Sequence, residues 1–177
     1  MKKAGVLCVA FLAGVSMSLA AGQVGVFGSY WNNQDGDGGA GAGANFKLKV
    51  HDYIALEARA TYFPKLSVEK DAAKADLKAL PMELGILGIL PLADQVNAYA
   101  GGGAGACYLD GEGLKVVDFK PSFYATAGLE FFFTESIGLF AEGTYRWCEW
   151  EVDEVLGNDT KGRLDGLGAN AGLTLRW

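Results

Sequence analysis

The sequence predicts an all-β fold, and three features of the chain carry that prediction. Apolar residues alternate with small or polar ones along eight segments, which is the period-two pattern of a strand with two different faces. Turn-forming residues separate these segments. The longest apolar run lies near the N-terminus and is shorter than the roughly 18 residues that a membrane-spanning helix requires.

The first twenty residues have the pattern of a secretory signal peptide. Lys2 and Lys3 precede a run of small and apolar residues, and Ser18 and Ala20 supply small side chains before a cleavage site. We therefore expect a mature domain over residues 21–177. Loss of the two lysines leaves 13 basic and 21 acidic residues, so 13 − 21 gives a net charge of −8. This charge does not favour nucleic acid as a partner.

Four strands are predicted in the first half of the mature domain. In residues 23–31, valine, glycine and tyrosine occupy alternate positions, and in residues 41–50 alanine, phenylalanine and leucine alternate with glycine, asparagine and lysine. Residues 54–63 alternate apolar side chains with glutamate, arginine and threonine. Residues 79–90 alternate leucine, methionine and isoleucine with glutamate and glycine. Pro81 predicts an irregularity in this strand because proline cannot donate to the ladder.

Four more strands follow. Residues 96–109 are rich in glycine and alanine, and residues 121–133 alternate phenylalanine, alanine and leucine with threonine, glycine and glutamate. Residues 137–150 repeat the pattern, with isoleucine, leucine, tyrosine and tryptophan opposite glutamate, threonine and arginine. Residues 167–177 alternate leucine and alanine with small or polar residues and end on Trp177. Their length suits a tilted transmembrane strand of about 9–11 residues.

The connections between these strands alternate in length. Short turns are expected at residues 51–53, 91–95 and 134–136, and long charged loops at residues 32–40, 64–78, 110–120 and 151–166. Short turns at one end and long loops at the other are typical of an up-and-down barrel that crosses a membrane.

The composition of the two faces indicates which one points outward. The polar face is mostly glycine, threonine, serine and asparagine, with few charges, whereas a water-facing surface carries many more. Aromatic residues cluster near both strand ends, as in the two belts of a membrane barrel: Tyr30, Tyr62, Tyr108, Tyr145 and Trp147 near one, and Tyr53, Phe131, Phe133 and Trp177 near the other. The sequence therefore predicts an eight-stranded antiparallel transmembrane β-barrel with its apolar face toward lipid. The alternative is a secreted, soluble lipocalin-like barrel that binds a small apolar ligand inside.

With this layout, its signal peptide and its terminal aromatic residue, the chain resembles the small eight-stranded outer-membrane proteins of the OmpA membrane-domain and OmpX kind. The resemblance implies a monomer in the outer membrane of a Gram-negative cell, with both termini in the periplasm and lipopolysaccharide as a neighbour. In that family the terminal aromatic residue helps the barrel-assembly machinery to recognise the chain, which makes Trp177 the expected assembly signal.

The inward face of the predicted barrel carries charges that must pair, because buried unpaired charges are costly. We expect a lumen charge network of four glutamates and three cations: Lys47, Glu57, Arg59, Glu83, Glu130, Glu142 and Arg146. Since eight strands enclose an interior that side chains can fill, this network is expected to plug the lumen. A gated or ion-conducting core is the alternative.

Cys107 and Cys148 are the two cysteines of the mature domain and form a possible disulfide. Both fall on the inward phase at similar height, in a compartment where disulfides persist. Their strands are not neighbours, however, and strand spacing alone separates them by about 10 Å, whereas a disulfide needs α-carbons within about 7 Å. The pairing stays open at this point.

The sequence favours a structural or surface-interaction role in envelope integrity, adhesion or ligand contact through the outer loops. No catalytic residue, cofactor or metal is expected. Asp35 and Asp37 resemble the start of a calcium loop, but the downstream ligands are missing. The single histidine, His51, lies in a predicted short turn and is not expected to act as a catalytic base. An outer-membrane enzyme that modifies lipid A is a further alternative.

Overall fold

The computed structural model describes residues 21–33, 38–70, 73–111, 114–152, 160–163 and 165–177. The expected signal peptide and the pair Asp35 and Asp37 lie outside these ranges. Within them the chain forms strands only: β1 (Gly22–Asn33), β2 (Gly39–His51), β3 (Ile54–Lys70), β4 (Ala73–Ala93), β5 (Val96–Gly111), β6 (Leu114–Phe132), β7 (Ile137–Val152), β8 (Thr160–Arg163) and β9 (Gly166–Arg176). In this described part, no helix is long and apolar enough to cross a membrane.

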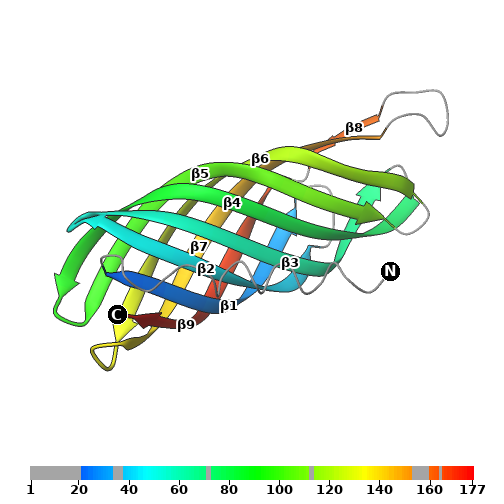
Figure 1. The fold of residues 1–177 in the computed structure, drawn as a ribbon. Helices are drawn as coiled ribbons and strands as arrows, with labels where there is room; N and C mark the ends of the chain where they lie inside the picture. The colour runs from blue at the N-terminus through cyan, green and yellow to red at the C-terminus, as the bar shows by residue number, and fades with distance from the viewer. Residues whose placement is uncertain (1–20, 34–37, 71–72, 112–113, 153–159, 164) are drawn as a thin grey trace, which may run out of the picture.

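Eight of these strands close into an antiparallel up-and-down barrel (Figure 1). Each strand from β1 to β7 pairs with the next in the chain, and β9 pairs with both β7 and β1. The β1–β9 seam is continuous from Gln23↔Arg176 to Asn33↔Gly166. The short β8 adds only to the far end of β7. The predicted eight-stranded barrel is therefore confirmed, and closure leaves no free edge, as a hydrocarbon environment requires.

The outward face of the barrel is apolar, and its interior holds the buried charges. The outward Leu84 is 68% exposed and Leu167 is 63% exposed, whereas the inward Glu57 and Arg146 are 2% and 1% exposed. A soluble barrel would need a polar outer face. The soluble lipocalin-like alternative is therefore wrong, because the outer face is apolar and the middle of the interior is filled by paired charges.

The barrel has two unlike ends. The turn end carries the connections 52–53, 94–95 and 133–136 together with the start of β1 and the end of β9. At the opposite hairpin end, β3–β4 pairing continues to Lys70↔Ala73 and β5–β6 pairing continues to Gly111↔Leu114. Figure 1 shows these strands running on beyond the closed part of the barrel.

The prediction that residues 64–78 and 110–120 form long loops is therefore wrong. The described residues of these segments are strand: 64–70 and 73–78 belong to β3 and β4, 110–111 and 114–120 to β5 and β6, and 151–152 and 160–163 to β7 and β8. The alternation that reveals a strand arises where one face meets a core or lipid and the other does not. A hairpin that projects past the barrel loses that contrast, so its sequence looks like a charged loop.

The β3–β4 ladder is interrupted at Pro81, as predicted, since its pairs pass from Ala60↔Met82 to Phe63↔Ala79. On its other side Pro81 pairs in register with Cys107 of β5. An irregularity that was not predicted, a register shift in β3 between Phe63 and Leu66, lies beside Pro64.

Glycines on the inward face of β5 allow the barrel wall to bend sharply beside β4. A Cβ atom on Gly101, Gly103 or Gly105 would collide with the backbone carbonyl oxygen of Ile86, Leu84 or Met82, respectively. The alternate glycines of β5 are thus required by the close approach of two backbones. The same inward row continues to Cys107 and Leu109.

Candidate functional site

The centre of the lumen is built around the guanidinium of Arg59 on β3. Its Nη2 donates to Glu57 Oε2 at 2.8 Å, and its Nη1 donates to Glu142 Oε1 at 2.9 Å. The side chains of all three residues are 0% exposed. One arginine therefore joins β3 to β7 across the barrel interior.

Neutral donors complete the coordination of the two central carboxylates. The hydroxyl of Tyr99 donates to Glu142 at 2.7 Å, and Asn170 Nδ2 donates to the same carboxylate at 2.8 Å. The hydroxyl of Tyr124 donates to Glu57 at 3.0 Å. Buried carboxylates supplied with charged and neutral donors hold their positions firmly. This central layer therefore cross-links five strands: β3, β5, β6, β7 and β9.

A second ion pair lies toward the turn end. Lys47 Nζ is 2.6 Å from Glu130 Oε1, and both side chains are about 5% exposed or less. Gln23 Nε2 donates to the same carboxylate at 2.7 Å. The Lys47 ammonium also lies 4.0 Å from the centre of the Tyr99 ring, a distance that favours a cation–π contact.

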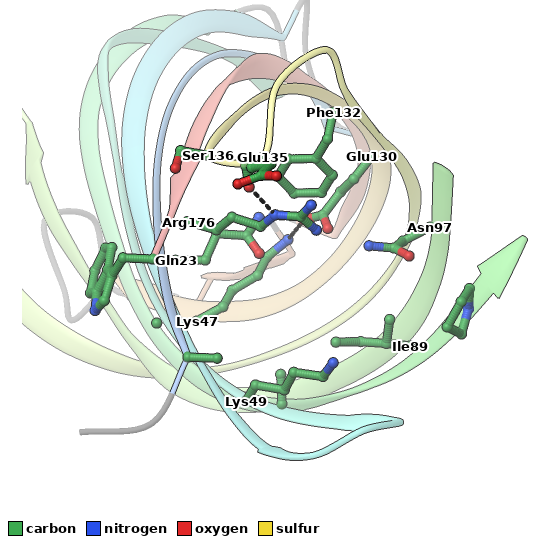
Figure 2. Close-up of a pocket in the computed structure, with 15 residues that line it drawn as sticks. Gln23, Lys47, Lys49, Ile89, Asn97, Glu130, Phe132, Glu135, Ser136 and Arg176 are labelled. Carbon is green, nitrogen blue, oxygen red and sulfur yellow. Dashed lines mark hydrogen bonds and ion pairs between the residues drawn. The ribbon is translucent and has the colours of Figure 1, made fainter. Parts of the chain in front are cut away.

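The turn end opens into a cavity of about 480 Å³. Figure 2 shows Lys47, Gln23 and Arg176 converging on it, with Glu130 behind them. Arg176 Nε donates to the carbonyl oxygen of Glu135 at 2.6 Å, and its guanidinium lies 3.8 Å from the Phe132 ring centre. The Lys47–Glu130 pair lines this cavity, and the fully buried Arg59 layer lies beyond it.

The ion pair between Arg146 and Glu83 lies toward the hairpin end. Arg146 Nε donates to Glu83 Oε1 at 2.9 Å and its Nη2 donates to Glu83 Oε2 at 3.2 Å, which is a bidentate geometry. The Trp31 ring lies 5.5 Å from the Arg146 guanidinium carbon. The structure thus places the seven charged residues of the expected lumen network in ion pairs, of which Arg59–Glu57 lies within β3 and the others join different strands.

An apolar plug fills the lumen on the hairpin side of Arg146. Its members are all 5% exposed or less: Trp31, Phe63, Leu66, Leu77, Ala79, Cys107, Leu109 and Cys148. Trp31 and Phe63 lie with ring centres 5.4 Å apart. The sequence reasoning missed this plug, although the inward phase of the first and third strands already pointed to Trp31 and Phe63. Leu66 was hidden by the register shift beside Pro64.

Cys107 and Cys148 meet inside the apolar plug. Both are free, buried cysteines of the same apolar cluster. From the sequence their pairing is open, because a flat sheet would separate the two strands by about 10 Å. The barrel wall is curved, so inward side chains on β5 and β7 converge in front of β6.

The remaining singled-out residues lie at the turn end. His51 is exposed, and its Nδ1 accepts a hydrogen bond of 3.4 Å from the backbone amide of Tyr53. Trp177 is 44% exposed, and its backbone amide donates to the Gly22 carbonyl at 3.0 Å. In the part of the chain that the structure describes, no three histidine, cysteine or acidic residues lie close enough to hold a metal ion.

Comparison with known proteins gives one family and several similar folds. Residues 4–176 match the family model of the outer membrane protein beta-barrel domain. No curated protein sequence matches the chain. The structure is similar to that of Neisserial surface protein A (NspA), with a TM-score of 0.65 and 12% identity over 89% of this chain and 96% of that one.

Two further solved structures have a similar fold. The N-terminal β-barrel domain of OprF from Pseudomonas aeruginosa gives a TM-score of 0.56 with 11% identity, over 89% of this chain and 97% of that one. Ail, the attachment invasion locus protein of Yersinia pestis, gives a TM-score of 0.51 with 16% identity over the same shares, 89% and 97%. At these identities the similarity concerns the fold alone.

Proposed function

This chain belongs to the outer membrane protein β-barrel domain family, and we propose that its barrel is a plugged scaffold that presents the outer hairpins at the cell surface. The observation that carries this proposal is the contrast between a filled lumen and long projecting hairpins. β3 continues eight residues beyond Tyr62, an outward aromatic residue that is 49% exposed. At the spacing of an extended strand, that is about 25 Å of chain.

The proposed orientation puts the turn end, with both termini of the mature domain, in the periplasm and the hairpin end outside. Short turns at one end and long hairpins at the other support it, since bacterial outer-membrane barrels have this layout. In this orientation, Trp177 lies at the periplasmic rim, where the assembly machinery would recognise it. We further propose a monomer, because the closed barrel has no unpaired edge through which a second copy could extend the sheet.

The lumen supports a structural role in preference to conduction. An ion crossing it would have to break the Lys47–Glu130, Arg59–Glu142 and Arg146–Glu83 pairs in turn and then displace the apolar plug. Each pair is buried, and separating buried partners costs about 3–5 kcal/mol. The proposed lumen is therefore a cross-link that stiffens the barrel.

The charge of the outer segments indicates what they contact. Residues 32–40, 64–79, 110–120 and 149–166 contain 14 of the 21 acidic residues and 8 of the 15 basic ones, a net charge of −6. Ail has been solved with the heparin analogue sucrose octasulfate, a polyanion. The acidic outer segments of this chain oppose polyanion binding at close range. We propose instead that they contact lipopolysaccharide phosphates through divalent cations, or cationic surface ligands.

The proposed role is not catalytic. Every ionised side chain of the central lumen is engaged in a structural pair, and His51 lies at the turn end, away from the outer leaflet. Mass spectra of lipid A from a deletion strain test this part of the proposal. Unchanged spectra are expected, whereas a lost acyl or phosphate modification would favour the lipid A-modifying alternative.

Hairpin-shortened variants test the surface role. Replacing residues 67–76 with a two-residue turn joins Leu66 to its partner Leu77, so both plug residues stay in place. Replacing residues 110–117 similarly keeps Leu109. The two variants serve as controls for each other, and heat-modifiable gel migration shows whether each barrel still folds.

The purified barrels are then tested for binding to lipopolysaccharide aggregates with calcium, with a chelator, and to heparin. We expect calcium-dependent lipopolysaccharide binding by the parent, a several-fold loss in at least one folded variant, and no binding to heparin. Equal binding by the parent and both shortened barrels would contradict a surface role of these hairpins.

A further inference from the structure

The strand register places Cys107 and Cys148 on either side of β6. Cys107 of β5 pairs with Lys120, and Cys148 of β7 pairs with Ser122, two residues farther along the same strand. Both cysteine side chains face the lumen and are 0% and 1% exposed. The two cysteines thus lie at a similar level of the barrel, on two strands that are separated by β6.

The two thiols belong to one buried cluster. They share the apolar plug with Trp31, Leu77 and Leu109. The backbone amide of Cys148 is itself fixed by a hydrogen bond of 3.1 Å to the buried carboxylate of Asp165. Since the ladder holds both backbones, a bond between the cysteines requires their side chains to turn toward one another within the plug.

Each cysteine has one available partner. The chain contains three cysteines, and the third, Cys8, belongs to the expected signal peptide. Outer-membrane proteins pass through the periplasm, which is kept oxidising. Two thiols that share one cluster are expected to be oxidised in such a compartment unless an oxidant cannot reach them.

We propose that Cys107 and Cys148 form an intramolecular disulfide that bridges β5 and β7 across the lumen, and that it forms before the barrel closes. The oxidant is a protein dithiol–disulfide oxidoreductase in its disulfide form. A thiolate of the chain attacks that disulfide to give a mixed disulfide, and the second thiolate displaces the enzyme. Two protons and two electrons leave the cysteines, one S–S bond forms, and the oxidoreductase is released as a dithiol.

The timing follows from burial. In the closed barrel the apolar plug covers the thiols on one side and the Arg146–Glu83 pair lies below them. A protein oxidant cannot enter a lumen that side chains fill. Accessible thiols therefore exist only while the chain is unfolded in the periplasm, and the finished barrel keeps whichever redox state it had at closure.

The pairing is tested on full-length protein produced in the cell envelope and purified from outer membranes. The protein is unfolded in denaturant with an alkylating reagent, with or without prior reduction, and its intact mass is measured. We expect no alkylation without reduction and two added groups after reduction, with a disulfide-linked peptide joining the two cysteines. Two alkylated thiols in the unreduced sample would overturn the disulfide.

Single substitutions provide the controls. C107S and C148S should each leave one thiol that is alkylated only after unfolding, because the apolar plug still covers it. Alkylation of the remaining thiol in the folded variant, before any denaturant is added, would show that this thiol is accessible in the closed barrel and would contradict the burial argument on which the timing depends.

The timing is tested by refolding reduced protein into detergent micelles and then adding an oxidised disulfide oxidoreductase. We expect the folded barrel to oxidise at least tenfold more slowly than the same chain in urea. Equal rates would overturn formation before closure while leaving the bond itself supported by the mass measurement.

Discussion

Removal of the Arg59 guanidinium is the sharpest test of the lumen network. The substitution Arg59→Met keeps much of the side-chain volume but leaves the carboxylates of Glu57 and Glu142 without their cationic partner. Both side chains are 0% exposed. Loss of one partner from a buried ion pair costs about 3–5 kcal/mol, chiefly because a charge is left uncompensated. The hydroxyls of Tyr99 and Tyr124 still donate to these carboxylates, so we expect about 3–5 kcal/mol in total instead of twice that amount.

The measurement is urea-induced unfolding of the purified barrel in phospholipid vesicles, followed by tryptophan fluorescence. Lys49→Met is the matched control, because the Lys49–Asp52 pair is 3.9 Å apart with side chains 43% and 86% exposed. Exposed pairs of this kind contribute at most about 1 kcal/mol. The loss in Arg59→Met should therefore be several times larger than in the control.

A combined variant separates electrostatics from packing. Arg59→Met with Glu57→Gln and Glu142→Gln removes the stranded charges while nearly keeping the shapes, and should recover most of the lost stability. The reasoning is refuted if Arg59→Met is no less stable than Lys49→Met, or if the combined variant is as unstable as Arg59→Met alone.

Three further outcomes are expected. Gly103→Ala should lower the free energy of unfolding by about 1–3 kcal/mol in the same urea assay, because the new Cβ would meet the β4 backbone. Gly143→Ala should leave it unchanged, because the space around that Cβ is open. Trp177→Ala should lower the amount of barrel assembled in the outer membrane more than Trp147→Ala does. Trp147 is a matched control because the two tryptophans are similarly exposed, Trp177 at 44% and Trp147 at 43%. Equal amounts of the two variants on a heat-modifiable gel would argue against an assembly signal at Trp177. Planar-bilayer recordings should show no large stable conductance, and such conductance would contradict the plugged lumen.

The alternation of residues and the turn signals were enough to predict the barrel and its strand number, and the composition of the two faces predicted which one points outward. Outward Leu84 and inward Glu83 differ by one position in the sequence, and the structure places them on opposite sides of the wall. The period-two pattern determines the face of each residue because successive side chains of a strand point in opposite directions. For the same reason, the inward charges could be named before the structure was known.

The length of the outer strands and the composition of the plug were not predictable in this way. The segments 64–78 and 110–120 read as charged loops, yet hydrogen bonds between their two arms make them hairpins. Leu66 joins the plug only because the irregularity beside Pro64 shifts the register of β3 against β4. Pairing between strands depends on both partners, so a pattern along one strand does not contain it.

The sequence by itself determined the architecture, the outward apolar face and the identity of the charges in the lumen. Only the tertiary structure decided which charges pair, that Arg59 serves two carboxylates, and that Cys107 and Cys148 share one buried cluster. The physical reason is curvature. A flat sheet keeps β5 and β7 two strand spacings apart at about 10 Å, whereas the closed wall turns their inward side chains toward one another in front of β6.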